Sequence, residues 1–341
     1  MPQKRVTIQV LAEACQLSRN TVSKVFNQRG NVPESTRQFV LTKARELGYF
    51  SRAQLSSPAA AGGTIAVLSC SNPLNHNFGS MLMKAFTDTV CRGGYSVQMY
   101  ELSNTELVER RLPEGVSSEN IRGILCIELF DRGYLEMLSG LDLPTVSVDA
   151  YCQVNRSPIL CDVITMENMR SVIALTRQLL AAGARSLGFV GDRFHCNSFF
   201  ERWYGFCAAL QDEGLEPDPR LCILAKDGSQ YAHPDWTLAR LKEMPQLPDA
   251  FLCANDFHAV KLIQALKKLG RRIPEDVMVA GFGDGPEAAV IEPSLTTVHI
   301  PSSEMGVHAA ELLLGRIRNP ERPYTMTYVQ TTPVFRESTR R

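Results

Sequence analysis

The side chains best suited to recognising another molecule near the amino terminus are Arg19, Asn20 and Lys24, which lie close together in the chain. Arginine can donate two hydrogen bonds to the edge of a guanine, and asparagine can pair in the same way with adenine. Val22 and Val25 recur at helical spacing and face inward, so the polar side chains lie elsewhere on the helix surface. The alternative is a three-helix bundle with these side chains in solvent.

The distribution of charge favours the first interpretation. Residues 1–52 contain nine Lys and Arg but three Asp and Glu, whereas the whole chain contains 36 of each kind. A compact basic head on an acidic body predicts a polyanionic partner for the head alone. The alternative is a chance excess of positive charge on a solvated domain.

A second set of polar side chains follows apolar runs farther along the chain. The runs 65–68, 96–99, 123–126 and 145–148 form one series, and 186–190, 221–224, 250–253 and 277–280 form another. Such runs are typical of buried parallel strands, so the sequence predicts two doubly wound lobes with a ligand at the strand ends between them. The candidate effector residues are Ser69, Ser71, Phe78 on a loop, Glu128, Asp149, Arg202, Asn255 and Asp256. Two alternatives are that Asp256 caps the next helix and that Asp149 pairs with Arg202.

The elements that position the first set are three short helices. Thr7 is a good N-cap for a helix over 8–15, Ser18 caps a second helix, and a third begins near Pro33 and ends at Gly48. Two short helices joined by a tight turn predict an all-α helix-turn-helix domain over 1–50. A Ser-, Pro-, Ala- and Gly-rich stretch over 51–63 reads as a linker, and the α/β core occupies 64–341.

Other functional classes find little support in the sequence. No complete dinucleotide-binding loop, P-loop or nucleophile elbow is present, and the six histidines form no i,i+4 metal pair. We therefore expect no enzyme activity, no cofactor and no metal. The amino terminus lacks a signal peptide and no apolar run reaches membrane-spanning length, which predicts a cytoplasmic protein with reduced cysteines.

The amino-terminal pattern resembles the start of LacI/GalR-family transcriptional regulators. The resemblance rests on Val6-Thr7-Ile8, Leu11-Ala12, Ser18-x-x-Thr21-Val22-Ser23-Lys24-Val25-Phe26-Asn27, Thr36-Arg37 and Leu47-Gly48-Tyr49. By position in this pattern, Arg19, Asn20 and Lys24 match base-contacting residues, and Tyr49 matches the aromatic residue that ends the headpiece. Thr7, Ser18, Thr21, Ser23 and Asn27 match residues that mostly hold phosphates.

The head and linker depart from the family pattern at three places. Gln16 stands where the family usually has glycine in the turn, and a left-handed non-glycine residue there costs about 1 kcal/mol. Pro58 stands at the position of the leucine that family members insert into the minor groove, and Arg52 replaces the usual asparagine. Leu55 is the nearest candidate wedge. The alternative is a flexible tether that bends DNA little.

The resemblance continues to the end of the chain and implies a periplasmic-binding-protein-like core. By analogy the chain crosses between lobes near Val163, Pro293 and Thr325, which gives lobe one about 64–162 and 294–324 and lobe two about 163–293 and 325–341. Arg202 and Asn255 match effector-contacting positions. The family's first acidic residue in the run 281–284 is replaced by Gly283, which argues against a simple sugar unless Glu128 compensates.

Together these features predict a ligand-responsive, sequence-specific DNA-binding regulator. We expect a homodimer on a pseudo-palindromic operator, most often a repressor as in the family, with a small polar metabolite, a sugar or a related molecule, as effector. A transport protein that binds solutes shares the body but predicts an export signal and no basic head. An α/β enzyme is the third class, for which the sequence offers no catalytic constellation.

Overall fold

The computed structural model describes residues 8–26, 33, 36, 39–40, 43, 62–75, 77–117, 119–152 and 159–341. The predictions for Thr7, Asn27, Tyr49 and Leu55, and for linker residues 51–61, lie outside the described residues. None of the described helices combines the length and the apolar character that crossing a membrane requires.

The first two helices of the head form as their spacing predicts. α1 (Ile8–Cys15) and α2 (Arg19–Phe26) are joined by a turn in which Gln16 adopts the left-handed region at φ 53°. Leu11, Val22 and Val25 are buried together with Val40, the contribution of the third segment that can be described. This small core fixes which face of α2 points outward.

A six-stranded parallel sheet forms the first lobe. Its strand order, β10-β5-β4-β3-β1-β2, brings together segments from both ends of the core. The strands are β1 (Thr64–Ser69), β2 (Ser96–Glu101), β3 (Ile121–Ile127), β4 (Thr145–Val148), β5 (Asp162–Met166) and β10 (Met326–Val329).

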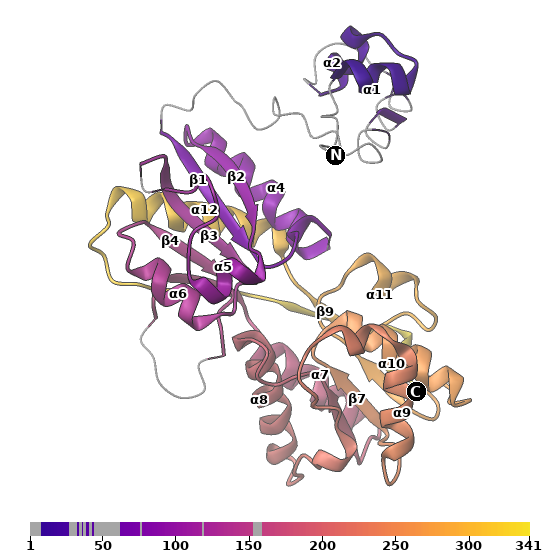
Figure 1. Ribbon diagram of the computed structural model, residues 1–341. Helices are drawn as coiled ribbons and strands as arrows, with labels where there is room; N and C mark the ends of the chain where they lie inside the picture. Colours follow the sequence, from indigo (N-terminus) through magenta and orange to yellow (C-terminus); the bar gives the residue numbers. More distant parts are fainter. Residues whose placement is uncertain are drawn as a thin grey trace.

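Alternate residues of β1 show how this sheet is covered on both faces. Ile65 and Val67 pack into a core cluster with α4 (Asn77–Arg92) and α12 (Ser302–Arg318). Ala66 and Leu68 pack on the other face, against α6 (Arg132–Ser139) and α5 (Asn104–Glu109). The four helices lie around the upper sheet in Figure 1. An apolar run with no polar alternation is therefore what this doubly covered strand requires.

The second lobe contains a smaller parallel sheet of β6 (Leu187–Val190), β7 (Ala250–Cys253) and β8 (Met278–Ala280). β9 (Thr297–His299) continues beside β8 and pairs antiparallel with β11 (Thr332–Val334). The helices of this lobe are α7 (Met169–Ala181), α8 (Asn197–Asp212), α9 (Pro234–Glu243), α10 (Asp256–Lys268) and α11 (Pro286–Val290). Four short 3₁₀ helices are η2 (Pro73–Asn75), η3 (Pro219–Leu221), η4 (Ser229–Ala232) and η5 (Glu337–Thr339).

One predicted strand of the second lobe is wrong. The apolar run 221–224 makes a single isolated bridge, between Ile223 and Val190, and Leu221 belongs to η3. Asp218 accepts a hydrogen bond from the backbone amide of Arg220, and the amide of Cys222 donates to the carbonyl of Pro219. This tight turn leaves too few extended residues for a full strand.

The sheet pairing moves two of the expected crossings between lobes by a few residues. β5 and β10 both belong to the six-stranded sheet, so the chain leaves that sheet after Met166 and again after Val329. Asp162 is fully buried at the start of β5 and accepts hydrogen bonds from Arg316 of α12 and from Thr325. These contacts explain why the first lobe retains both strands. The division of the whole chain into head, linker and core stays a prediction.

Candidate functional site

The exposed surface of α2 carries the side chains that the sequence nominates for DNA. The hydroxyl of Ser18 accepts a hydrogen bond from the backbone amide of Thr21 at 3.0 Å, which caps the helix at its start. Arg19, Asn20 and Lys24 are exposed, whereas Thr21 and Ser23 are half-buried. The helix therefore presents an arginine, an asparagine and a lysine on one rigid element, as contact with base edges and phosphates requires.

In the core, three neighbouring strands of the first sheet end in polar residues. Ser69 ends β1, Glu128 follows β3 and Asp149 follows β4. The Ser69 hydroxyl donates to the carbonyl oxygen of Ser71 at 2.6 Å, and the Ser71 hydroxyl donates to a carboxylate oxygen of Glu128 at 3.2 Å. The structure thus joins three of the predicted effector residues in one hydrogen-bonded chain at the carboxyl edge of the sheet.

Glu128 and Asp149 share an unusual backbone conformation. Their φ angles are 51° and 61°, in the left-handed region that residues with a side chain seldom adopt. Such geometry persists only where the surrounding structure holds it, and it is common at ligand sites. Burial raises the pKa of Asp149, against the lowering effects of a hydrogen bond from the Ala150 amide and of the charge of Arg202.

Arg202 reaches this region from the second lobe. It lies in the second turn of α8 and is 4 % exposed. Its Nε donates to Asn168 Oδ1 at 2.9 Å and its Nη1 donates to the carbonyl oxygen of Ala254 at 2.7 Å, while its guanidinium lies over the Phe282 ring. Burial lowers the pKa of Arg202 to about 10, although nearby acidic groups oppose this effect. No ion pair joins Arg202 to Asp149.

Asn255 and Asp256 follow β7 and have different local roles. Asn255 is the N-cap of α10, because its side-chain oxygen accepts a hydrogen bond from the His258 amide at 2.8 Å. Asp256 is the first residue of that helix and accepts hydrogen bonds from the Thr297 hydroxyl at 2.5 Å and from the Gly285 amide at 3.2 Å. Burial raises the pKa of Asp256 to about 6. The capping role foreseen for Asp256 therefore belongs to Asn255.

Comparison with known proteins gives the same architecture over almost the whole chain. A periplasmic binding protein-like domain model matches residues 176–339. The transcriptional regulator GalR of Lacticaseibacillus casei is 28% identical over 325 residues, which cover 93% of this chain and 94% of the relative. The part of this chain that the match leaves uncovered is shorter than the predicted head. The similarity therefore includes some helix-turn-helix residues as well as the core.

Over nearly its whole length the chain is similar to transcriptional regulators of the LacI/GalR family.

Solved structures show the same similarity. A complex of the transcriptional regulator CelR with cellobiose matches with a TM-score of 0.71 and 25% identity, over 98% of this chain and all of that one. The lac repressor dimer bound to operator and an anti-inducer shares the fold, with a TM-score of 0.67, 22% identity and coverage of 98% and 99%. The chain is a ligand-responsive, DNA-binding transcriptional regulator, and the relatives it matches are named as regulators rather than enzymes.

A group of residues that the sequence analysis missed lies in the second lobe, where this lobe meets the first. The Asp227 carboxylate faces two histidines, with His195 Nδ1 at 3.4 Å and His258 Nε2 at 3.5 Å. The ring of Phe130, which belongs to the first lobe, lies 5.2 Å from that of His195. The pKa of Asp227 is lowered: burial would raise it, but the hydrogen bond from His258 and the two histidine charges outweigh burial.

No sequence pattern identifies His195, Asp227 and His258, because each is a single residue far from the other two in the chain. The contact between Phe130 and His195 shows that aromatic rings from both lobes meet beside the polar strand ends. Within the residues that the structure describes, no cluster of side chains could hold a metal ion, and none of the ten cysteines forms a disulfide.

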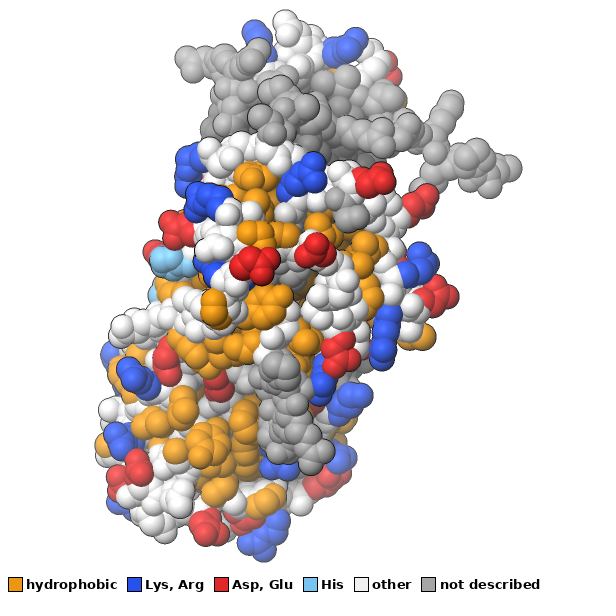
Figure 2. Space-filling model, turned by 90° about the vertical axis from the view of Figure 1, so that its left-hand side faces the viewer, with side chains coloured by type: hydrophobic (Ala, Val, Ile, Leu, Met, Phe, Trp, Pro, Cys, Tyr) orange, Lys and Arg blue, Asp and Glu red, His pale blue; other side chains and the backbone are white. Residues whose placement is uncertain are grey.

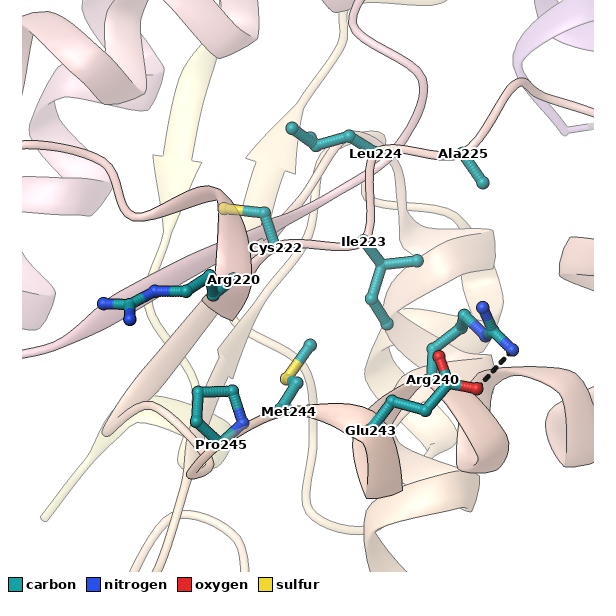
Figure 3. A pocket seen from close by; sticks show the side chains of 9 residues that line it. All are labelled: Arg220, Cys222, Ile223, Leu224, Ala225, Arg240, Glu243, Met244 and Pro245. Atoms are coloured by element: carbon teal, nitrogen blue, oxygen red, sulfur yellow. Dashed lines mark hydrogen bonds and ion pairs between the residues drawn. The ribbon is translucent and has the colours of Figure 1, made fainter.

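One prediction for the cleft is wrong. Phe78 is the second residue of α4 rather than part of a loop, and its ring packs against the core cluster. A cavity of about 570 Å³ beside α9 is not part of the cleft, since none of the predicted effector residues lines it (Figure 3). Its lining residues are Arg220, Cys222, Ile223, Leu224, Ala225, Arg240, Glu243, Met244 and Pro245.

Proposed function

We propose that the protein is a repressor that binds a pseudo-palindromic operator through α2 of each of two heads. The observation that carries this proposal is the orientation of α2. Val22 and Val25 are buried while Arg19, Asn20 and Lys24 are exposed on the same two turns. A helix that presents Arg and Asn can read guanine and adenine in the major groove. We expect Lys24 to add a third base contact, and Ser18, Thr21 and Ser23 to contact phosphates beside it.

The effector of this repressor is a small, hydroxyl-rich molecule, a sugar or a related polyol. The cleft residues contribute mainly acceptors, since Glu128, Asp149 and Asp227 are carboxylates and Arg202 is the one buried arginine beside them. Hydroxyl groups can donate to such oxygens without bringing negative charge. The complex of the related CelR with cellobiose supports a sugar-like ligand, and Glu128 supplies an acceptor where Gly283 lacks one.

Exposed apolar side chains support assembly into a homodimer. Leu74 and Met81 belong to the first lobe and Phe257 and Val290 to the second. All four side chains are well exposed. α4, α10 and α11 lie toward the right of Figure 1, whereas Figure 2 views the molecule from the opposite side, which carries further hydrophobic side chains over both lobes. A two-fold dimer buries the same patch from both copies and sets the two heads at a fixed spacing.

The proposal is tested by selecting duplexes from a random pool with the full chain. We expect an enriched site with two related half-sites. Arg19→Ala should lose roughly 1–3 kcal/mol at one base position, because a bidentate base contact has about that value. Glu13→Gln, at an exposed position of α1 with no predicted DNA contact, is the control and should leave the base preference unchanged. Failure to enrich any sequence over random competitor would leave a small-molecule receptor without an operator.

A further inference from the structure

A cavity of about 550 Å³ lies at the junction of the two lobes, and none of the predicted effector residues lines it. Glu167 and Met169 border it where the chain leaves β5 and enters α7, and Ala174 borders it farther along that helix. Tyr328 of β10 and Pro333 of β11 close it where the chain returns. Cavities of this size at domain junctions are common small-molecule sites.

The cavity contains a hydrogen bond between the two lobes. The Tyr328 hydroxyl, on the six-stranded sheet, donates to Glu201 Oε1 of α8 at 2.5 Å. Glu201 Oε2 accepts from Asn168 at 2.8 Å, and the side-chain oxygen of Asn168 accepts from Arg202. Two hydrogen bonds through Asn168 thus connect Glu201, which lines the cavity, to the buried Arg202 of the effector cleft.

Two of the three charged residues that line the cavity are the carboxylates Glu167 and Glu201, and the third is Arg170. Glu201 accepts from Asn197, Asn168 and Tyr328, and Glu167 accepts from two backbone amides of α7. In the part of the chain that the structure describes, neither carboxylate forms an ion pair with a lysine, arginine or histidine. The pKa of Tyr328 is raised, first by burial and then by its hydrogen bond to Glu201 and the surrounding negative charge.

The apolar part of the lining lies beside these carboxylates. Met169, Ala174, Pro333 and the ring of Tyr328 offer hydrocarbon surface, and Met169, Ala174 and Tyr328 are exposed, so a ligand can enter from solvent. Arg170 is the single basic residue of the lining, and it is exposed. A cationic head with an apolar body matches this combination, because the head gains from the two carboxylates, neither of which forms an ion pair among the described residues, while the body covers the hydrocarbon.

We propose that this hinge cavity is a second ligand site that takes a small organic cation, with its ammonium group toward Glu167 and Glu201 and its apolar body against Met169, Ala174 and Tyr328. A ligand held there contacts both lobes, so it favours one relative position of the lobes over others. The existence of the site is independent of the proposed function, whereas its effect on an operator rests on that function.

The test compares three probes of one shape on the full chain by calorimetry: phenethylammonium, 2-phenylethanol and 3-phenylpropionate. We expect the cation to bind about tenfold more tightly than the alcohol and the anion not to bind. Glu167→Gln should remove most of the difference between cation and alcohol. Equal affinities for the three probes, or tightest binding of the anion, would overturn the proposal.

The location of the site is tested with a blocking side chain. Ala174→Phe fills the cavity from an exposed position of α7 and should abolish binding of phenethylammonium, and Ala174→Leu is the milder variant if the first fails to fold. Gln178→Phe is the control, since Gln178 is exposed one turn farther along the same helix and does not line the cavity. Cation binding that survives both Ala174 variants would place the site elsewhere. Because no operator is needed, failure of the proposed function would not affect this result.

Discussion

The guanidinium of Arg202 lies 3.7 Å from the centroid of the Phe282 ring, and the same side chain donates hydrogen bonds to Asn168 and to the carbonyl of Ala254. A buried arginine stacked on an aromatic ring keeps a fixed orientation, because its planar group is held on its face as well as at its edge. Three segments that are distant in the chain therefore meet at one cation in the core.

Replacing Arg202 is expected to affect stability and ligand response together. Arg202→Ala leaves the oxygens of Asn168 and Ala254 without their donors, which costs about 1–3 kcal/mol for each buried group left unsatisfied. Arg202→Lys keeps the charge but loses the planar stacking and the forked donors. Urea unfolding should show the smaller loss for lysine, and thermal shift with candidate sugars should show no ligand response in either variant. A ligand-induced shift of wild-type size in Arg202→Ala would remove this residue from the site.

The buried carboxyl of Asp256 predicts a specific pH dependence. Because its folded pKa is about 6, above the ordinary value of 3.8, the folded chain still holds this proton where the unfolded chain has lost it. The contribution of Asp256 to the free energy of unfolding is therefore full below about pH 4 and declines as the pH rises to about 6. Asp256→Asn has no such proton and should lack this decline in urea titrations. Glu304→Gln, at an exposed position of α12, should keep the wild-type slope.

Close packing of α4 against α12 depends on Gly306. A Cβ at this position would lie 2.2 Å from the carbonyl oxygen of Leu82 and 3.0 Å from the amide nitrogen of Phe86. Gly306→Ala should therefore destabilise the chain by about 1–3 kcal/mol, even though alanine favours a helix more than glycine does. His308→Ala changes an exposed residue of the same helix and should leave the midpoint of thermal unfolding nearly unchanged. If Gly306→Ala were as stable as His308→Ala, α4 and α12 could move apart without loss of stability, and the packing argument would be wrong.

The cap of α2 provides a test on the head. The hydroxyl of Ser18 accepts from the Thr21 amide, so Ser18→Ala should destabilise the helix by about 1 kcal/mol. Since α2 presents the base-reading side chains, operator binding should weaken with no change in base preference. Ser18→Asp restores an acceptor for the amide but adds charge near DNA, so it should recover helical circular dichroism without recovering operator affinity. Loss of base preference in Ser18→Ala would indicate a direct base contact.

Local patterns predicted most of the elements and the polar ends of three strands in the first lobe. The spacing of Val22 and Val25 gave the buried face of α2, and the apolar run of β1 gave a doubly covered strand, because both depend on neighbouring residues. The hydrogen bond between Tyr328 and Glu201 escaped prediction, since it joins segments that only the folded topology brings together. The strand predicted over 221–224 is wrong, because the turn that Asp218 stabilises outweighs the β propensity of these residues.

The contacts around Asp227 show the same limit for the site. Nothing near His195, Asp227 or His258 in the sequence marks them as partners, whereas Glu128 and Asp149 were found because each directly follows a recognisable strand. Sequence position thus revealed the polar strand ends of the first lobe. The second-lobe residues around Asp227 could be identified only from the structure.

The account is tested most directly by measuring the affinity of the full chain for its selected operator with and without a saturating sugar-like ligand identified by thermal shift. We expect the two affinities to differ by roughly 5–150-fold in the wild-type chain, the usual range of coupling between two sites, and not to differ in Arg202→Lys. An operator affinity that stays constant while the ligand saturates the wild-type core would contradict the account.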